Sequence, residues 1–242
     1  MIVIPMAGLS SRFFKAGYTE PKYMLKAHGE TLFAHAVNSF KNYFSKETFL
    51  FIVRDVYQTA EFVDKSAKSL GIQNYIIKIL NEDTRGQAET VALGLQGLEY
   101  QGAITIFNID TFRPDFQFPE TEMSGDGYLE VFQGTGDNWS FAKPMNENST
   151  LVCKTAEKNP ISDLCCTGLY HFSDINDYLS IYNEYLNKPQ AEWEKGELYV
   201  APLYNLLIAK GALVHYHLID RDQVIFCGVP AEYDDFLSYK AE

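Results

Sequence analysis

Apolar and polar positions alternate along the first half of the chain in a pattern typical of strands followed by helices. Residues 1–5 form a short apolar run that ends at a turn, as buried parallel strands do. Residues 32–40 then place apolar side chains at helical spacing. The same reasoning predicts, in chain order, a strand at 49–54, a helix at 57–70, a strand at 75–80, a helix at 87–98 and a strand at 103–110. Strands that alternate with helices predict a mostly parallel sheet covered on both faces.

The rhythm changes after Asp110. Apolar segments with short polar connections predict consecutive strands at 127–133, 139–144, 150–158 and 165–172, and helices are expected near 174–186 and 200–210. No linker, repeat or low-complexity tract separates the two parts of the chain. We therefore predict a single α/β domain over residues 1–242, with halves at 1–115 and 116–242 and with antiparallel strands added in the second half.

Composition and charge exclude several classes of protein. Of the 242 residues 46% are hydrophobic and 14% are aromatic, which suits one large core. A formal net charge of -12 repels nucleic acid and anionic lipid. No window approaches the ~20 apolar residues of a membrane span. We expect a cytoplasmic protein without nucleic-acid or membrane partners, and leave open whether it forms a homo-oligomer. The four cysteines lack the spacing of a zinc site and are expected to be reduced thiols.

Positive charge is concentrated near the amino end. Residues 1–26 carry Arg12, Lys15, Lys22 and Lys26 against Glu20, a net charge of +3, whereas the remainder of the chain carries -15. Small residues surround these cations and allow backbone N–H groups to approach an anion closely. The loop fits neither the Walker pattern nor the dinucleotide fingerprint. A cradle for a polyphosphate is one interpretation, and a tight turn with solvated cations is the other.

A carboxylate ends the predicted strand at 103–110. Asp110 ends the segment Asn108-Ile109-Asp110, and ligands of parallel sheets bind beyond the carboxyl ends of the strands. A hard cation such as Mg²⁺ would take an oxygen from this aspartate and others from substrate phosphates. The alternative is a turn or a helix cap. Together, the cations after the first strand and the carboxylate that ends the strand at 103–110 are what a magnesium nucleotide needs on opposite sides of its phosphates.

Six short motifs carry a resemblance that spans nearly the whole chain. The chain resembles the nucleotidyltransferase superfamily that includes sugar-1-phosphate nucleotidyltransferases and small cytidylyltransferases. The motifs are Ala7-Gly8-Leu9-Ser10-Ser11-Arg12 with Pro21-Lys22, Thr84-Arg85-Gly86-Gln87-Ala88, Asn108-Ile109-Asp110, Glu157-Lys158, Thr167-Gly168-Leu169-Tyr170, and Gly228-Val229-Pro230 with Tyr233. Serine stands at position 10, where the superfamily has its second glycine.

The resemblance implies a fold and an activity. The fold is a Rossmann-like, doubly wound, mostly parallel mixed sheet with a nucleotide-binding half at 1–115 and an acceptor-binding half at 116–242. The activity is transfer of a nucleotidyl group from a nucleoside triphosphate to a small phosphorylated acceptor, in the first instance a sugar-1-phosphate. Pyrophosphate is released, Mg²⁺ is the cofactor, and the product would be an activated precursor for capsule or other surface polysaccharide. The base and the acceptor stay undetermined.

The resemblance also implies roles for individual residues. Arg12 would hold the β- and γ-phosphates, Lys22 the α-phosphate, Asp110 the Mg²⁺ and Lys158 the phosphate of the acceptor. The other nucleotide-binding positions would be Ala7, Gly8, Leu9, Ser10, Ser11, Gln87 and Asn108, and the other acceptor-binding positions Glu157, Gly168 and Glu197. Larger relatives carry a second metal carboxylate where this chain has Phe226 and Cys227, so Asp220 and Asp222 are its candidate substitutes.

Other interpretations stay open at this point. Gln87 also suits the start of a helix, Lys158 a solvated position at a strand end, and Gly168 a crowded strand. The aromatic segment 193–204 suits core packing as well as an acceptor pocket. Two other functions compete, namely a metal-dependent glycosyltransferase, which usually needs two acids where this chain has Asn108 and Asp110, and a non-catalytic nucleotide-sugar sensor.

Overall fold

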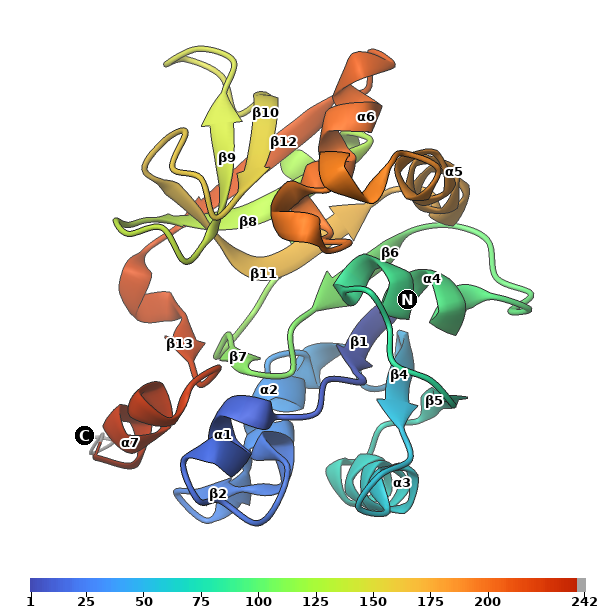
Figure 1. Ribbon diagram of the computed structural model, residues 1–242, viewed down its shortest axis with the longest axis vertical. Coiled ribbons are helices and arrows are strands. Elements are labelled where there is room, and N and C mark those ends of the chain that lie inside the picture. Colours follow the sequence, from blue (N-terminus) through green and yellow to red (C-terminus); the bar gives the residue numbers. More distant parts are fainter. Residues whose placement is uncertain (239–242) are drawn as a thin grey trace.

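A parallel sheet forms the first half of the protein, as the sequence predicts. The computed structural model describes residues 1–238. Strand β1 pairs with a parallel neighbour on each side, and the strand order in this half is β6-β1-β4-β5. In Figure 1 β6 lies near the centre of the view, with β1, β4 and β5 below it. The strands are β1 (Ile2–Met6), β4 (Thr48–Arg54), β5 (Asn74–Leu80) and β6 (Ile104–Phe107).

Antiparallel strands extend the same sheet on the other side of β6. Strand β11 pairs antiparallel with β6, β8 and β9, so the sheet continues without a break from one half of the chain into the other. Over the described residues the sheet has nine strands. The predicted mixed α/β fold is therefore confirmed. The added strands are β8 (Gly127–Gln133), β9 (Ser140–Pro144), β10 (Val152–Glu157), β11 (Leu164–Phe172) and β12 (Val214–Ile219).

Helices cover both faces of the sheet because neighbouring residues of a strand point to opposite sides. In β1, Val3 joins a core under α4, α5 and α6, whereas Ile2 and Ile4 join a core under α2 and α3. Helices α1 and α7 border the second core. The helices are α1 (Ser11–Lys15), α2 (Leu32–Asn38), α3 (Thr59–Leu70), α4 (Gln87–Leu95), α5 (Ile175–Leu186), α6 (Tyr204–Ala209) and α7 (Pro230–Ser238).

Short elements connect these layers. The two-residue strands are β2 (Lys26–Ala27), β3 (Glu30–Thr31), β7 (Thr111–Phe112) and β13 (Ile225–Phe226). The helix expected over 200–210 is divided, with a 3-10 turn first and α6 after it. The 3-10 turns are η1 (Lys22–Met24), η2 (Lys41–Tyr43), η3 (Glu122–Ser124), η4 (Gln190–Glu192), η5 (Glu194–Gly196), η6 (Ala201–Leu203) and η7 (Arg221–Gln223).

The last helix packs against the first loop region. The Tyr233 hydroxyl on α7 donates a hydrogen bond of 2.7 Å to the carbonyl oxygen of Lys26. The Tyr233 ring also lies 6.2 Å, edge to face, from the ring of Phe13 on α1. Figure 1 shows α7 and α1 side by side at the lower left. Residues 228–233 are therefore held beside the cation-rich amino-terminal segment.

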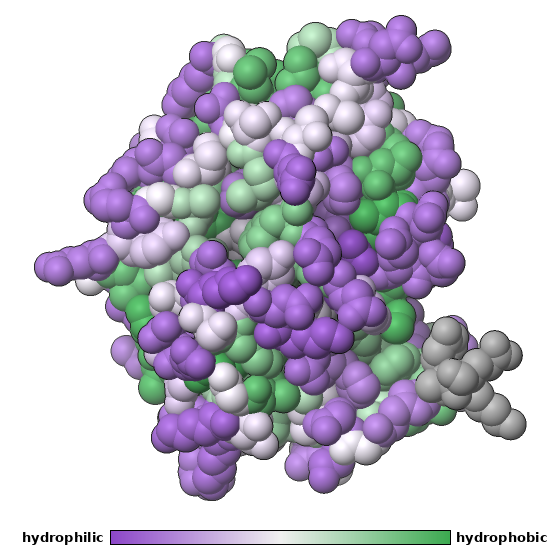
Figure 2. All heavy atoms as spheres, turned by 180° about the vertical axis from the view of Figure 1, so that it is seen from behind, coloured by the Kyte–Doolittle hydropathy of each residue, from purple (hydrophilic) through white to green (hydrophobic). Residues whose placement is uncertain are grey.

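The visible surface is mostly hydrophilic. In Figure 2 hydrophilic residues spread over most of the visible face, and hydrophobic residues occur in small separate patches. No helix within residues 1–238 has both the length and the apolar character needed to cross a bilayer.

A buried ion pair ties β7 to the antiparallel part of the sheet. Arg113 follows β7 and is 5% exposed, and its Nε donates to Glu130 Oε1 on β8 at 2.8 Å. Glu130 is 0% exposed and also accepts a hydrogen bond of 3.0 Å from the Thr167 hydroxyl. Arg113 Nη1 donates to the carbonyl oxygen of Gln223 at 2.7 Å, just before β13. The pair therefore connects three segments that converge near Asp110.

Replacing Arg113 by methionine should lower the free energy of unfolding by about 3–5 kcal/mol, because Glu130 then keeps a buried charge without a partner. The double variant Arg113→Met/Glu130→Met should regain most of that loss. Chemical denaturation measures both. The exposed pair Lys65–Glu61 supplies the control, since Lys65→Met should cost no more than about 0.5 kcal/mol. Equal losses in the two single variants would contradict the structural role of the buried pair.

Acid should destabilise the protein through His171 on β11. This side chain is 2% exposed, and its Nδ1 forms a 2.9 Å hydrogen bond with the Thr105 hydroxyl. Burial, together with the positive amino terminus, lowers the pKa of His171 to about 4. The unfolded chain therefore binds a proton at higher pH than the folded protein, and stability is lost as the pH falls from about 6.5 towards 4.

The measurement compares unfolding free energies of the wild type and of His171→Phe. Between about pH 7 and pH 5 the wild type should lose roughly 2 kcal/mol more than the variant. Parallel pH profiles for the two proteins would show that His171 does not titrate in this range.

Candidate active site

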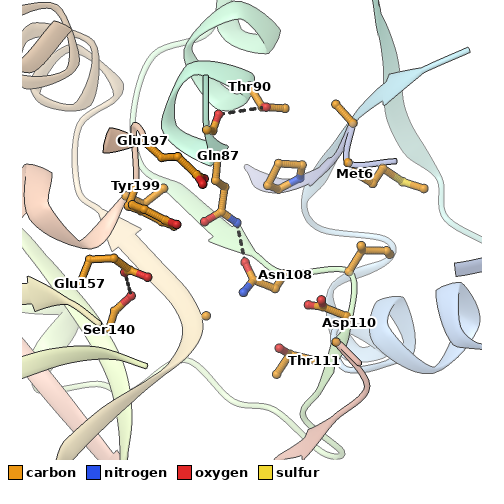
Figure 3. Close-up of a pocket in the computed structure, with 18 of the residues that line it drawn as sticks. Met6, Gln87, Thr90, Asn108, Asp110, Thr111, Ser140, Glu157, Glu197 and Tyr199 are labelled. Atoms are coloured by element: carbon orange, nitrogen blue, oxygen red, sulfur yellow. Dashed lines mark hydrogen bonds between the residues drawn. The ribbon is translucent and has the colours of Figure 1, made fainter. Parts of the chain in front are cut away.

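One large cavity lies where ligands of parallel sheets bind, beyond the carboxyl ends of β1 and β6. Its volume is about 1060 Å³, and residues from both halves of the chain line it. In Figure 3 the labelled side chains Glu157, Glu197 and Tyr199 face the cavity from one side, and Asn108 and Asp110 lie towards the other. This volume lies at the upper end of the usual range for small-molecule sites, about 300–1,000 Å³.

Most of the residues that are predicted to contact the nucleotide belong to the loop after β1. Ala7, Gly8, Leu9, Ser11 and Arg12 all line the cavity.

Ser10 does not line the cavity and instead shapes the loop. Its φ of 52° lies in the left-handed region that usually favours glycine. The Ser10 hydroxyl accepts a hydrogen bond of 3.1 Å from the backbone N–H of Lys22. The structure thus shows a supporting role for Ser10, and its contact with a nucleotide stays a prediction.

Lys22 and Asp110 meet at the cavity wall. Lys22 Nζ lies 2.5 Å from Asp110 Oδ2, although the two residues are 88 positions apart in sequence. Both side chains line the cavity and are about one-fifth exposed, at 20% and 23%. The Asp110 backbone is also fixed, because its carbonyl oxygen accepts a 2.8 Å hydrogen bond from the N–H of Cys227. The structure thus brings together the cation and the carboxylate that the sequence placed at neighbouring strand ends.

Asn108 and Gln87 form a second polar pair in the cavity. Gln87 Nε2 donates to Asn108 Oδ1 at 2.5 Å, shown as a dashed line in Figure 3. Gln87 is also the first residue of α4, which confirms the helix-start interpretation, and its contact with a nucleotide stays a prediction. Gly168 on β11 allows this arrangement, because it has a φ of 96° and a Cβ atom there would overlap the Asn108 carboxamide. Gly168 therefore supports Asn108 as well as lining the cavity.

The segment that carries Gln87 is bonded to the opposite wall. Leu198 N–H donates to the carbonyl oxygen of Arg85 at 2.9 Å, and Ala88 N–H donates to the carbonyl oxygen of Leu198 at 2.8 Å. Gly86 lies between them with a φ of 147°, and a Cβ atom on it would lie 2.5 Å from Leu198 O. This close backbone contact joins the loop of the first half to residues 196–200 of the second half.

Lys158 and Tyr199 stand on that opposite wall. Lys158 has a φ of 49°, and its Nζ donates to the Tyr199 hydroxyl at 2.6 Å. Burial alone would lower the pKa of Lys158, but the bond to Tyr199 and the nearby Glu157 and Glu197 raise it above its ordinary value. Lys158 is therefore a cation at neutral pH that lines the cavity.

Some aromatic residues of the segment 193–204 line the cavity, and others pack in the core. Tyr199 lines the cavity, whereas Trp193 and Tyr204 pack in the core beneath α5 and α6. Trp139, just before β9, and Ser140, its first residue, also line the cavity. The sequence did not identify these two residues. Their positions follow from strand pairing in the sheet, and no local motif marks them.

The two candidate substitutes for the second metal carboxylate do not reach the cavity. Asp220 and Asp222 are exposed, and Asp220 caps the turn η7. Glu232 on α7 lines the cavity instead, and its Oε2 accepts hydrogen bonds from Gly228 N–H at 2.8 Å and Val229 N–H at 3.2 Å. A glutamate in the first turn of a predicted helix could have identified Glu232 in the sequence. That signal, however, indicates a helix cap and not a residue of the cavity.

The oxygen donors near Gly228 suit a hard divalent cation. A Cβ atom on Gly228 would lie 3.1 Å from Asp110 Oδ2 and 3.6 Å from Glu232 Oε2, so both carboxylates border this glycine. Burial, with Glu232 and Asp110, raises the pKa of Cys227 to about 12, so this residue stays a thiol and supplies no thiolate ligand. No group of three or more His, Cys, Asp or Glu within residues 1–238 could hold a metal. Substrate phosphates or water would have to complete the coordination, as is usual for Mg²⁺.

Comparison with solved structures identifies a close relative. The chain is 66% identical to the nucleoside-diphosphate-sugar pyrophosphorylase from Vibrio cholerae RC9, with a TM-score of 0.96, over 99% of this chain and 100% of that chain. No protein-family model matches, and no curated protein matches.

Two distant structures share the fold. A candidate glucose-1-phosphate thymidylyltransferase from Bacillus anthracis, in complex with a sucrose, has a TM-score of 0.77 at 17% identity, covering 98% of this chain and 93% of that chain. The inositol-1-phosphate CTP transferase from T. maritima has a TM-score of 0.71 at 16% identity, covering 98% of this chain and 94% of that chain. At such low identity these likenesses show the fold alone.

Gly168→Ala should displace Asn108, because the added methyl group occupies the position of its carboxamide. Gly17 is a matched control, since it has the same φ of 96° with no atom within 4 Å of an added Cβ. Gly17→Ala should therefore cost only the backbone strain, about 1 kcal/mol, and Gly168→Ala clearly more. Chemical denaturation compares the two variants, and a crystal structure of Gly168→Ala should show Asn108 moved. Equal losses with Asn108 in place would contradict this account.

Proposed function

Because the chain belongs to the family of nucleoside-diphosphate-sugar pyrophosphorylases, which are nucleotidyltransferases, we propose that it transfers a nucleotidyl group from a nucleoside triphosphate to a phosphorylated acceptor. Pyrophosphate is the other product, and a sugar-1-phosphate is the first acceptor to test. One observation carries this proposal. Lys22, Asp110 and Lys158 line a single cavity although they come from distant parts of the sequence.

Charge repulsion is the main obstacle to this reaction. An acceptor phosphate and a triphosphate are both anionic, and two unit charges about 4 Å apart repel by about 4 kcal/mol at an effective dielectric constant near 20. Cations on the cavity wall reduce this repulsion for each phosphate that they contact. A protein with a net charge of -12 therefore needs its cations concentrated here.

The first half of the chain would hold the nucleotide. Arg12 has a planar guanidinium that suits two phosphate oxygens at once, so we assign it to the β- and γ-phosphates. Lys22 is assigned to the α-phosphate. Gly8, beside which an added Cβ would meet no atom within 4 Å, leaves its backbone open to the nucleotide, and Gln87 is placed to contact the base.

Asp110 and Glu232 would hold the Mg²⁺. When bound, the ion would neutralise charge on the phosphate oxygens and help to align them. Lys22 and Asp110 neutralise each other in the protein alone, and each exchanges that contact for a phosphate or a cation when substrate binds.

The second half would hold the acceptor. Lys158 would contact its phosphate, with Tyr199 fixing the direction of the lysine side chain through the 2.6 Å hydrogen bond. Glu157 and Glu197 line the cavity beyond Lys158 and would face the organic part of the acceptor. Gly168 lies between the two binding regions, beside Asn108.

In the reaction, an oxygen of the acceptor phosphate attacks the α-phosphorus in line with the departing group. A new phosphorus–oxygen bond forms as the bond to the β-phosphate breaks, and its electron pair leaves with pyrophosphate. The acceptor phosphate is already an anion near neutral pH, so no general base is required. The product is a nucleotide-activated precursor, and supply of such precursors for capsule or another surface polysaccharide is the role we propose.

Lys22→Ala should reduce pyrophosphate release by about 10²–10³-fold, because a fixed cation beside the reacting phosphates is lost. The assay combines each common nucleoside triphosphate with a panel of phosphorylated acceptors and Mg²⁺, and it measures pyrophosphate with the wild type first. Lys41→Ala is the control, because Lys41 pairs with Asp115 on the surface, where both side chains are more than half exposed, and should keep wild-type activity.

The same assay separates the competing functions. A glycosyltransferase would release a nucleoside diphosphate from a nucleotide-sugar, and a sensor would bind nucleotide without releasing pyrophosphate. Wild-type activity retained in Lys22→Ala would contradict the assignment of the site even if the enzyme class is right.

A further inference from the structure

The acceptor side of the cavity carries more carboxylates than cations. Glu157 and Glu197 both line it, and Glu194 lies directly behind them, since its side chain accepts a hydrogen bond from the backbone N–H of Glu157. Lys158 lies at this wall with the neutral Tyr199 hydroxyl as its partner, and Arg85, which also lines the cavity, is paired with Glu89. No salt bridge within residues 1–238 joins Lys158 to a carboxylate. The three acids therefore have no ion-paired cation.

Glu157 is the most unusual of these acids because it is nearly buried. Its residue is 5% exposed, yet it lines the cavity. The Ser140 hydroxyl donates to Oε2, as the dashed line in Figure 3 shows, and the Tyr170 hydroxyl donates to Ser140 Oγ at 3.3 Å. The described residues provide no hydrogen-bond donor for the other oxygen, Oε1. One oxygen of a buried carboxylate is thus oriented by the protein, and the other is left for a ligand.

The surroundings of Glu157 disfavour a negative charge that has no partner. Burial raises the pKa of its carboxyl group, and Glu194 and Glu197 raise it further, against the lowering effects of the Ser140 hydrogen bond and of Lys158. Buried carboxylates in proteins are either paired with a cation or protonated. A cationic ligand group would supply the missing partner.

Phosphate binding makes the imbalance larger. Under the proposed function Lys158 contacts the acceptor phosphate, so its charge is offset and no longer available to the three glutamates. Sugar hydroxyl groups could fill the space, but they would leave the negative charge in place. A protonated amine donates hydrogen bonds to Glu157 Oε1 and also neutralises charge.

Aromatic rings on the same side of the cavity suit an ammonium group. Lys158 Nζ lies 4.7 Å from the centre of the Tyr199 ring, at its hydroxyl end. Trp139 and Phe226 also line the cavity, with ring centres 4.8 Å apart. Aromatic faces attract cations through their quadrupole, so rings in the same cavity as Glu157 favour a protonated amine.

We propose that the acceptor is a phosphate monoester that carries a protonated amine, and that Glu157 binds this amine while Lys158 binds the phosphate. This inference rests on the proposed function and specifies its substrate class. An amino-sugar phosphate with a free amine and an amino-alcohol phosphate share the required chemistry, and the experiment distinguishes them.

The test uses the purified full chain with Mg²⁺ and each common nucleoside triphosphate, and it compares two matched pairs of acceptors. Glucosamine-1-phosphate is compared with glucose-1-phosphate, and phosphoethanolamine with 2-hydroxyethyl phosphate. In at least one pair the amine should give a kcat/KM of pyrophosphate release about 10- to 100-fold higher than its hydroxyl counterpart, the usual effect of a hydrogen bond to a charged group. The pair that shows this preference identifies the source of the amine.

Glu157→Gln then tests the residue assigned to the amine. Glutamine keeps the shape and the hydrogen bond from Ser140 but removes the charge, so the preference for the amine should fall to within about threefold. Calorimetric affinity for the amine acceptor should fall in parallel, which is a readout independent of turnover. The control is Glu184→Gln, because Glu184 pairs with Lys210 on the surface. The paired-acceptor comparison needs only the wild type, so it decides the question even if the variant does not fold.

The possible results separate a failure of the inference from a failure of the proposed function. Hydroxyl acceptors used as well as their amine partners would overturn the inference and leave the proposed function intact. Nucleotide binding with no pyrophosphate release from either amine acceptor would also overturn the inference. Failure to bind any magnesium nucleotide would overturn the proposed function itself.

Discussion

The contact between Lys22 and Asp110 is the interaction on which the site depends. It joins the loop after β1 to the segment after β6, and these are neighbours because the two strands are parallel and paired. The contact keeps a cation and a carboxylate together at one cavity wall in a protein with a net charge of -12. Each group is neutralised in the absence of substrate. Neither therefore carries the full cost of an isolated charge in a partly buried position.

Close backbone contacts extend this local arrangement across the whole molecule. Gly86 approaches Leu198 and Gly168 approaches Asn108, and in both places a side chain on the glycine would push the two halves of the cavity apart. The continuous sheet through β6 and β11 holds the same halves at the level of secondary structure. The resulting cavity has two chemically different sides. One side has cations for phosphates, and the other has Glu157 and its acidic neighbours, which favour a ligand of opposite charge.

The sequence predicted the framework well where strands are uniformly apolar. Segments such as 49–54 and 103–110 are buried from both faces, so their hydrophobic runs identify them, and β4 and β6 occur there. It did not indicate β12, because Val214–Ile219 contains two histidines and is only partly buried at its place beside β8. It also did not show that the helix near 200–210 begins as a 3-10 turn, which includes Pro202.

The sequence by itself determined which groups could handle phosphates, because small residues, cations and the aspartate at a strand end are local features of the chain. Only the tertiary structure decided how they are used. Ser10 supports the loop because the fold holds it in a left-handed conformation. Glu232 reaches the cavity, and Asp220 does not, because α7 packs against the amino-terminal loop while the turn η7 faces solvent. The burial of Glu157 follows from strand pairing between β9 and β10, which brings it to Ser140. Distances between remote residues depend on how strands pair and helices pack, and no local pattern of residues encodes them.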